Sequence, residues 1–145
     1  MLTSQQISNH LPHKYPMLMV DRITELEAGI RGVGIKNVTI NESYFQGHFT
    51  SDPVMPGVLI VECMAQTAGL VFGHGQSQGG NHQYIPTSKY LAKIDQMKFV
   101  KKVVPGDQLV IEVKLLRIFA RLIQVSASAR VDNTLVASGR LTFAG

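Results

Sequence analysis

The chain has 145 residues, 45% of them hydrophobic, and a net charge of +4 with a pI near 9.4. This length predicts one domain over residues 1–145 with a single sizeable core, and the hydrophobic content excludes an intrinsically disordered chain. The one cysteine, Cys63, excludes an internal disulfide framework and a multi-cysteine zinc site. Its apolar neighbours predict an inert, buried thiol.

The positive charge indicates an acidic partner but does not identify one. Nucleic acid is disfavoured, because the chain has no tryptophan and no helix-turn-helix, zinc-knuckle or RNP pattern. A small acidic carrier protein would be attracted by the same charge, which is equally typical of an ordinary solvated surface. The candidate basic residues are Lys98, Lys101, Lys102, Lys114, Arg117 and Arg121.

Residues 1–16 are polar and lack the apolar segment of a secretory signal. No apolar run reaches the roughly 18 residues that a membrane-spanning helix needs. We therefore expect no membrane span and a cytoplasmic location.

In chain order, we expect a short helix ending at residues 11–12, strands at 21–26 and 32–39, and a loop at 41–56. Thr3 or Ser4 can cap the helix, and Gln6 stands where a capping box from Thr3 requires it. Pro53 and Pro56 stiffen the loop, because each ring fixes its own backbone and biases the preceding residue away from helix.

An apolar helix is expected over about residues 58–72, and the rest of the chain must surround it. It is apolar on nearly every face, which is typical of a helix in the middle of a domain. Glu62 lies inside it, where a carboxylate is costly to desolvate unless it has a partner or a task. Gln66 returns to the same face four residues later, and Gly69 and Gly73 continue this stripe. The pattern indicates a functional site.

Three further candidates lie where this helix begins. Gly57 opens the helix, whose first N–H groups have no intrahelical acceptor, so the amides at Gly57 and Val58 can bind a developing negative oxygen. His48 lies fourteen positions before Glu62. Each feature has a structural alternative: the imidazole as a loop residue, the carboxylate as half of an ion pair, and the amides as those of any helix. Together they favour a catalytic site.

Residues 73–88 are rich in glycine and polar side chains, which predicts a mobile connection or lid. His74 and His82 fall within it, but no H-E-x-x-H or Cys/His spacing supports a metal site. We interpret both as solvated loop histidines and expect no metal.

The remaining chain alternates between apolar and polar residues as antiparallel strands do. A type II turn is expected at 104–107 and a hairpin turn at 132–134. Five or six strands wrapped around the helix make an α+β architecture. Because a helix that is apolar all round takes more than one such sheet to cover, we expect a homodimer with the site near its seam. The residues expected on one buried face are Leu109, Ile111, Val113 and Leu115.

Four collinear runs carry a family resemblance: LPHKYPMLMVDRI (11–23), FQGHF (45–49), DPVMPGVLIVECMAQ (52–66) and KFVKKVVPGDQL (98–109). The chain resembles the (3R)-hydroxyacyl-acyl-carrier-protein dehydratases of type II fatty acid synthesis. This resemblance implies a hotdog fold, in which an antiparallel sheet wraps around a long central helix. It also implies a dimer-based oligomer, often a trimer of dimers, with a site shared between two subunits. The implied partner is acyl carrier protein bearing a 3-hydroxyacyl thioester, and no cofactor is required.

Residue by residue, the resemblance places the catalytic histidine at His48 and the catalytic carboxylate at Glu62. Gly57 matches the residue whose N–H contacts the thioester oxygen, and Gln66 matches a glutamine that supports the carboxylate. An imidazole suits removal of the C2 proton at neutral pH, and a carboxyl kept protonated by apolar neighbours can donate to the departing C3 hydroxyl. Alternatively, His48 makes both proton transfers while Glu62 holds a water or the hydroxyl.

Related families offer other activities. Dehydratase-isomerases typically have aspartate at the Glu62 position and tryptophan at the Ala65 position, which disfavours isomerisation here. A hotdog acyl thioesterase and a non-catalytic acyl-binding module remain the alternatives. The chain departs from the family pattern at Thr50, where proline is usual, and at Lys93, where glycine is frequent. Lys93 is expected to face solvent, touch the carrier or obstruct the acyl channel.

Overall fold

A computed structural model describes residues 1–73 and 89–145. The expected lid, with His74 and His82, lies outside these described residues. The helices are α1 (Ser4–His10), the short 3-10 helix η1 (Ser43–Gln46) and α2 (Gly57–Gly73). The strands are β1 (Arg22–Glu27), β2 (Arg31–Asn37), β3 (Tyr90–Phe99), β4 (Gln108–Phe119), β5 (Leu122–Val131) and β6 (Thr134–Ala144).

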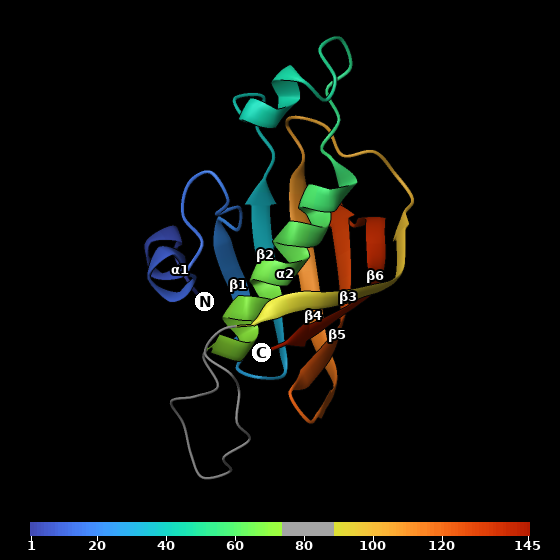
Figure 1. Cartoon of the computed structure of the whole chain (residues 1–145). Coiled ribbons are helices and arrows are strands. Elements are labelled where there is room, and N and C mark those ends of the chain that lie inside the picture. The colour runs from blue at the N-terminus through green and yellow to red at the C-terminus, as the bar shows by residue number, and fades with distance from the viewer. Residues whose placement is uncertain (74–88) are drawn as a thin grey trace.

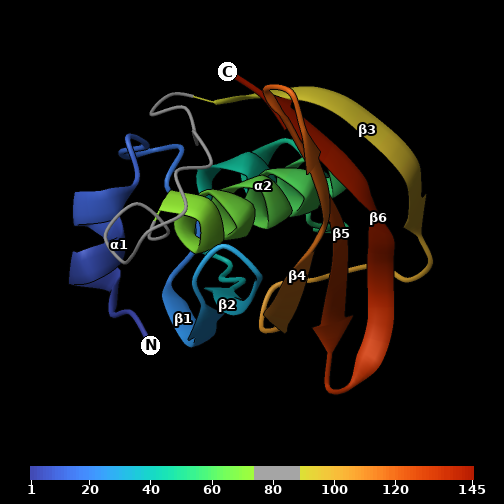
Figure 2. The same ribbon diagram turned by 90° about the horizontal axis from the view of Figure 1, so that it is seen from below.

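The six strands form one antiparallel sheet in the order β1-β2-β4-β5-β6-β3. The sheet curves around α2, while α1 lies on the side of α2 that the strands leave open (Figures 1 and 2). β3 follows α2 along the chain but pairs at the far edge of the sheet, beside β6. The predicted α+β arrangement of an antiparallel sheet wrapped around a long helix is confirmed.

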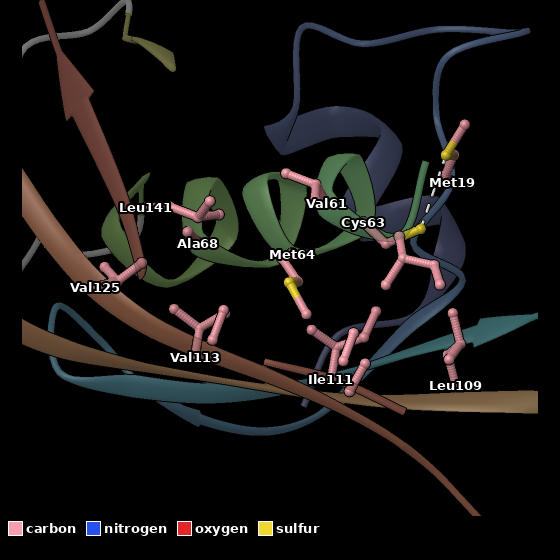
Figure 3. Close-up of a cluster of buried hydrophobic side chains, with 14 of the residues drawn as sticks. Met19, Val61, Cys63, Met64, Ala68, Leu109, Ile111, Val113, Val125 and Leu141 are labelled. Carbon is pink, nitrogen blue, oxygen red and sulfur yellow. Dashed lines mark hydrogen bonds between the residues drawn. The ribbon is translucent and has the colours of Figure 1, made fainter. Parts of the chain in front are cut away.

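The main core lies between α2 and the concave face of the sheet. Leu109, Ile111 and Val113 of β4 are fully buried, as the alternation predicted, and point toward α2 (Figure 3). Burying each large aliphatic side chain contributes about 1.5–3 kcal/mol, so this layer fixes where α2 lies on the sheet.

Two glycines of β2 let α2 approach the sheet closely. A Cβ added to Gly32 would lie 2.6 Å from Val71 Cγ2, and one added to Gly34 would lie 2.6 Å from Thr67 Oγ1. Real Cβ atoms essentially never lie this close to a non-bonded atom, so a side chain at either position would force Val71 or Thr67 of α2 to shift away from the strand.

One stripe of α2 stays accessible in the isolated chain. Val58, Gly69 and Gly73 are exposed, and the Glu62 side chain is 25% exposed. The sheet and α1 of one chain therefore leave this stripe uncovered. The stripe includes the carboxylate that the sequence singled out.

Local signals gave most of the element ends correctly. Thr3 and Gln6 form the predicted capping box at α1, and Gly106, with φ of +99°, occupies the third position of the predicted type II turn. β2 ends at Asn37, two residues earlier than expected, and η1 was not predicted.

No helix within the described residues is long and apolar enough to cross a membrane.

Candidate active site

His48 is held in a tight loop that leads into α2. Its Nδ1 lies 2.6 Å from the Val54 carbonyl oxygen, and the Val54 amide donates back to the His48 carbonyl at 3.0 Å. Because a carbonyl only accepts, Nδ1 carries the proton and donates it. The neutral ring therefore keeps the lone pair on Nε2, which can act as a base. The ring also stacks on Phe49, with centroids 4.1 Å apart.

A cavity of about 430 Å³ lies beside this imidazole. His48 and Gly57 both line it, together with Phe99 and residues 100–103, which follow β3. Gly57 is the first residue of α2, so its N–H has no acceptor inside the helix. The Phe99 ring lies directly over Gly57, and an added Cβ would be 3.0 Å from its Cε1 atom. The cavity thus combines a base with a backbone donor.

Glu62 belongs to a second cluster, on the accessible stripe of α2. Gln66 Nε2 donates to Glu62 Oε1 at 2.9 Å, which matches the predicted four-residue spacing. Gln66 itself is buried: its Oε1 accepts from the Met19 amide at 2.9 Å, and its Nε2 also donates to the Met17 carbonyl at 2.6 Å. The glutamine therefore has a fixed orientation and presents its N–H to the carboxylate.

His13, which sequence reasoning did not select, reaches the same carboxylate. Its Nε2 lies 3.5 Å from Glu62 Oε1, within ion-pair distance. His13 is 49 positions from Glu62 along the chain, in the loop after α1. The run LPHKYP that contains it was part of the resemblance, but no spacing rule connects a loop residue to a distant helix.

The structure brings the expected residues together in two groups. His48 and Gly57 share the cavity, and Glu62 and Gln66 share a hydrogen bond. Glu62 is not among the described residues that line the cavity. Val58 is 75% exposed and also lies outside that lining.

A buried ionic network supports the loop that carries His48. Lys36, only 6% exposed, donates to Glu42, and the Tyr44 hydroxyl donates to the other oxygen of the same carboxylate. Burial and this carboxylate raise the pKa of Tyr44. The network fixes η1 against the end of β2, and η1 ends at Gln46, directly before Gly47 and His48. Strand alternation offered a signal, since it places Lys36 on the same inward face as Gly34.

The two departures from the family pattern both face outward. Thr50 is exposed, and its hydroxyl donates to the Gln46 carbonyl at 3.3 Å. The Lys93 side chain is 66% exposed and pairs with Asp95 at 3.4 Å. Of the three expectations for Lys93, the isolated chain fits the solvent-facing one.

Comparisons with known proteins identify the family. The model of the FabA-like domain matches residues 11–140. A 3-hydroxyacyl-[acyl-carrier-protein] dehydratase FabZ from Acetivibrio thermocellus is 46% identical over 147 residues, covering 99% of this chain and 94% of the relative. A protein of the same name from Streptococcus equi subsp. zooepidemicus is 48% identical over 144 residues, covering 99% of this chain and 98% of the relative.

Solved structures agree on the fold. The dehydratase heterocomplex ApeI:P from Xenorhabdus doucetiae superposes with a TM-score of 0.76 at 18% identity, covering 95% of this chain and 89% of the other. A hypothetical thioesterase with coenzyme A from Streptococcus pneumoniae gives 0.62 at 13% identity, covering 85% and 83%. At these identities the likeness establishes the predicted hotdog fold alone. Because the family model spans most of its length and its FabZ relatives are nearly half identical, the chain belongs to the FabA-like family, among the 3-hydroxyacyl-[acyl-carrier-protein] dehydratases.

Proposed function

We propose that the chain dehydrates (3R)-3-hydroxyacyl thioesters on acyl carrier protein to trans-2-enoyl thioesters, as a step of fatty acid biosynthesis or a related acyl pathway. Two relatives that are named 3-hydroxyacyl-[acyl-carrier-protein] dehydratase FabZ, at 46% and 48% identity, support this activity. The observation that carries the chemistry is the His48 Nδ1–H donated to Val54, which leaves Nε2 as a base in a cavity that also contains the Gly57 amide. Thioester hydrolysis and binding without turnover remain the alternatives that the assay must exclude.

The proposed elimination uses three groups. His48 Nε2 accepts the C2 proton, and the electrons of that C–H bond form the C2–C3 double bond as the C3–O bond breaks. Glu62 donates a proton to the departing hydroxyl, which leaves as water. The Gly57 N–H, with Val58 beside it at the start of α2, stabilises the charge that develops on the thioester oxygen. In the alternative division of labour, His48 makes both transfers and Glu62 holds the hydroxyl through a hydrogen bond.

A second copy of the chain would unite the two halves of this site. β3 lies at the edge of the sheet and carries exposed apolar side chains, among them Ile94 and Phe99, each 50% exposed. An uncovered apolar edge strand is a template for pairing with another strand. Because Phe99 also lines the His48 cavity, a partner at this edge would lie at the mouth of the cavity. We infer a homodimer, assembled as a trimer of dimers, in which Glu62 of one chain faces His48 of the other.

The partner that delivers the substrate is proposed to be acyl carrier protein, in the cytoplasm. On the outer face of the sheet, a groove of about 610 Å³ gathers cations from four strands. They are Lys98 of β3, Lys114 of β4, Arg130 of β5 and Arg140 of β6. Among the described lining residues, the single carboxylate is Glu112, which pairs with Lys114 at 2.7 Å. Such a surface would attract an acidic carrier.

The test is an assay with a 3-hydroxyacyl thioester on carrier protein and on N-acetylcysteamine. Dehydration gives enoyl absorbance, hydrolysis gives free thiol, and binding alone gives neither. We expect His48→Ala and Glu62→Gln to keep the fold by circular dichroism and to lower the dehydration rate about 100-fold or more. Near-normal turnover in either folded variant contradicts the assignment. If the basic groove attracts the carrier, added salt will raise KM for the carrier-bound substrate only.

A further inference from the structure

The environment of His13 is unusual in two respects. Its Nε2 faces Glu62 Oε1 at 3.5 Å, and that oxygen also accepts the hydrogen bond from Gln66. Its Nδ1 is buried and has no hydrogen-bond partner among the described residues. A buried nitrogen without a partner lowers the stability of the folded chain. An apolar side chain would therefore suit this position better if its role were only structural.

We infer that His13 is a positioning residue for Glu62, an inference that rests on the proposed dehydration. Both side chains approach the same oxygen: Gln66 Nε2 donates to Glu62 Oε1 at 2.9 Å, and His13 Nε2 lies 3.5 Å from it. Glu62 Oε2 has no partner within the described parts of the chain, so it is the oxygen left to meet the C3 hydroxyl. With a hydrogen bond from Gln66 and the contact with His13 both on Oε1, the carboxyl group keeps one orientation that leaves Oε2 for the substrate. The buried Nδ1 of His13, which has no hydrogen-bond partner among the described residues, is then explained by the function of the residue and not by a gain in stability.

The surroundings give His13 a fixed approach to the carboxyl group. Gln66 binds the Met17 carbonyl and the Met19 amide, which ties the segment after His13 to α2. Lys14, the neighbouring cation, is turned the other way: its Nζ donates to the carbonyl of Ser8 and, at 3.2 Å, to that of Leu11. A variant of Lys14 thus loosens the same segment without removing a contact of Glu62.

The decisive comparison is between His13→Gln and His13→Asn. The glutamine amide nitrogen reaches the place of Nε2, whereas the shorter asparagine does not. With carrier-bound substrate, we expect His13→Asn to lower kcat about 10-fold to 100-fold with KM nearly unchanged, because the acid is misaligned after the substrate has bound. His13→Gln should recover most of kcat. Lys14→Met is the matched control and should keep kcat within about twofold of the parent chain.

A third variant separates positioning from folding. His13→Leu removes the buried Nδ1 that has no hydrogen-bond partner among the described residues, so we expect its thermal unfolding midpoint to be no lower than that of the parent. Its kcat should nevertheless fall as in His13→Asn. Equal kcat for the Gln and Asn variants, or an unchanged kcat in a folded His13→Leu, would overturn the inference. Glu62→Gln is measured alongside. If it turns over normally, the proposed function itself fails, whereas an inactive Glu62→Gln beside fully active His13 variants refutes only the role of His13.

Discussion

Cys63 lies one residue after the proposed acid, yet its surroundings make it chemically inert. The thiol is fully buried, and its Sγ lies 3.7 Å from the Met19 Sδ (Figure 3). Burial raises the pKa of Cys63 to about 12. Since the thiolate is the reactive form, a thiol-specific reagent should label no cysteine in the native protein at pH 8 and one after denaturation. Labelling in the native state with loss of activity would contradict this structural role.

The same thiol gives a pH dependence with a defined sign. The folded protein keeps this proton up to about pH 12, whereas the unfolded thiol releases it near its ordinary pKa of 9.0. The contribution of Cys63 to the free energy of unfolding is therefore complete below pH 9 and is lost as pH rises from 9 toward 12. Urea unfolding of the parent and of Cys63→Ala at pH 8 and pH 10.5 measures it. The parent should lose more stability than the variant between these two pH values.

At this scale, the sequence predicts contacts made within one element and misses contacts between distant ones. The Glu62–Gln66 bond follows from helical spacing, and His48 was recognisable from its motif. Neither the His13–Glu62 contact nor the Lys36–Glu42 pair was predicted. The first joins a loop to a helix and the second joins a strand to a loop, so each depends on how the sheet places those segments.

The packing of α2 on β2 depends on positions that have no side chain. Thr67, which faces Gly34, is fully buried, and its hydroxyl donates to the Cys63 carbonyl at 2.9 Å, so it cannot move aside easily. We expect Gly34→Ala to lower the free energy of unfolding by about 1–3 kcal/mol. The matched control is Gly47→Ala, because no atom lies within 4 Å of its added Cβ and its φ is −120°. Urea unfolding should show the control within about 0.5 kcal/mol of the parent. Equal losses would mean that the glycines act through backbone flexibility alone.

Elements with a strong period were predicted more reliably than short or aperiodic ones. β4 and β5 alternate over ten or more residues, and α2 is apolar throughout, so their types follow from the sequence. η1 spans only four residues, too few for a period to show. The strand order was not predictable, because β3 passes from α2 to the far edge of the sheet and no local signal records that crossover.

At the scale of the molecule, the cavity beside His48 and the stripe of α2 around Glu62 are both accessible in one chain, and Glu62 is not among the described residues that line the cavity. The sequence predicted a seam because α2 is too apolar for one sheet to cover. It gave no means of saying which edge forms that seam. The homodimer proposed above places the seam at β3, whose exposed apolar side chains include Ile94 and Phe99.

A charge placed on this edge should separate the copies without unfolding either. Ile94 is 50% exposed on β3, so Ile94→Lys removes little core packing but opposes pairing with a second β3. The matched control is Ile30→Lys, since Ile30 is 51% exposed in the turn between β1 and β2, at the other end of the sheet order. Light scattering should give an oligomer for the parent and Ile30→Lys, and a folded monomer for Ile94→Lys. If the site is shared, that monomer should also lose most dehydration. A fully active monomer would instead place His48 and Glu62 in one chain's own site.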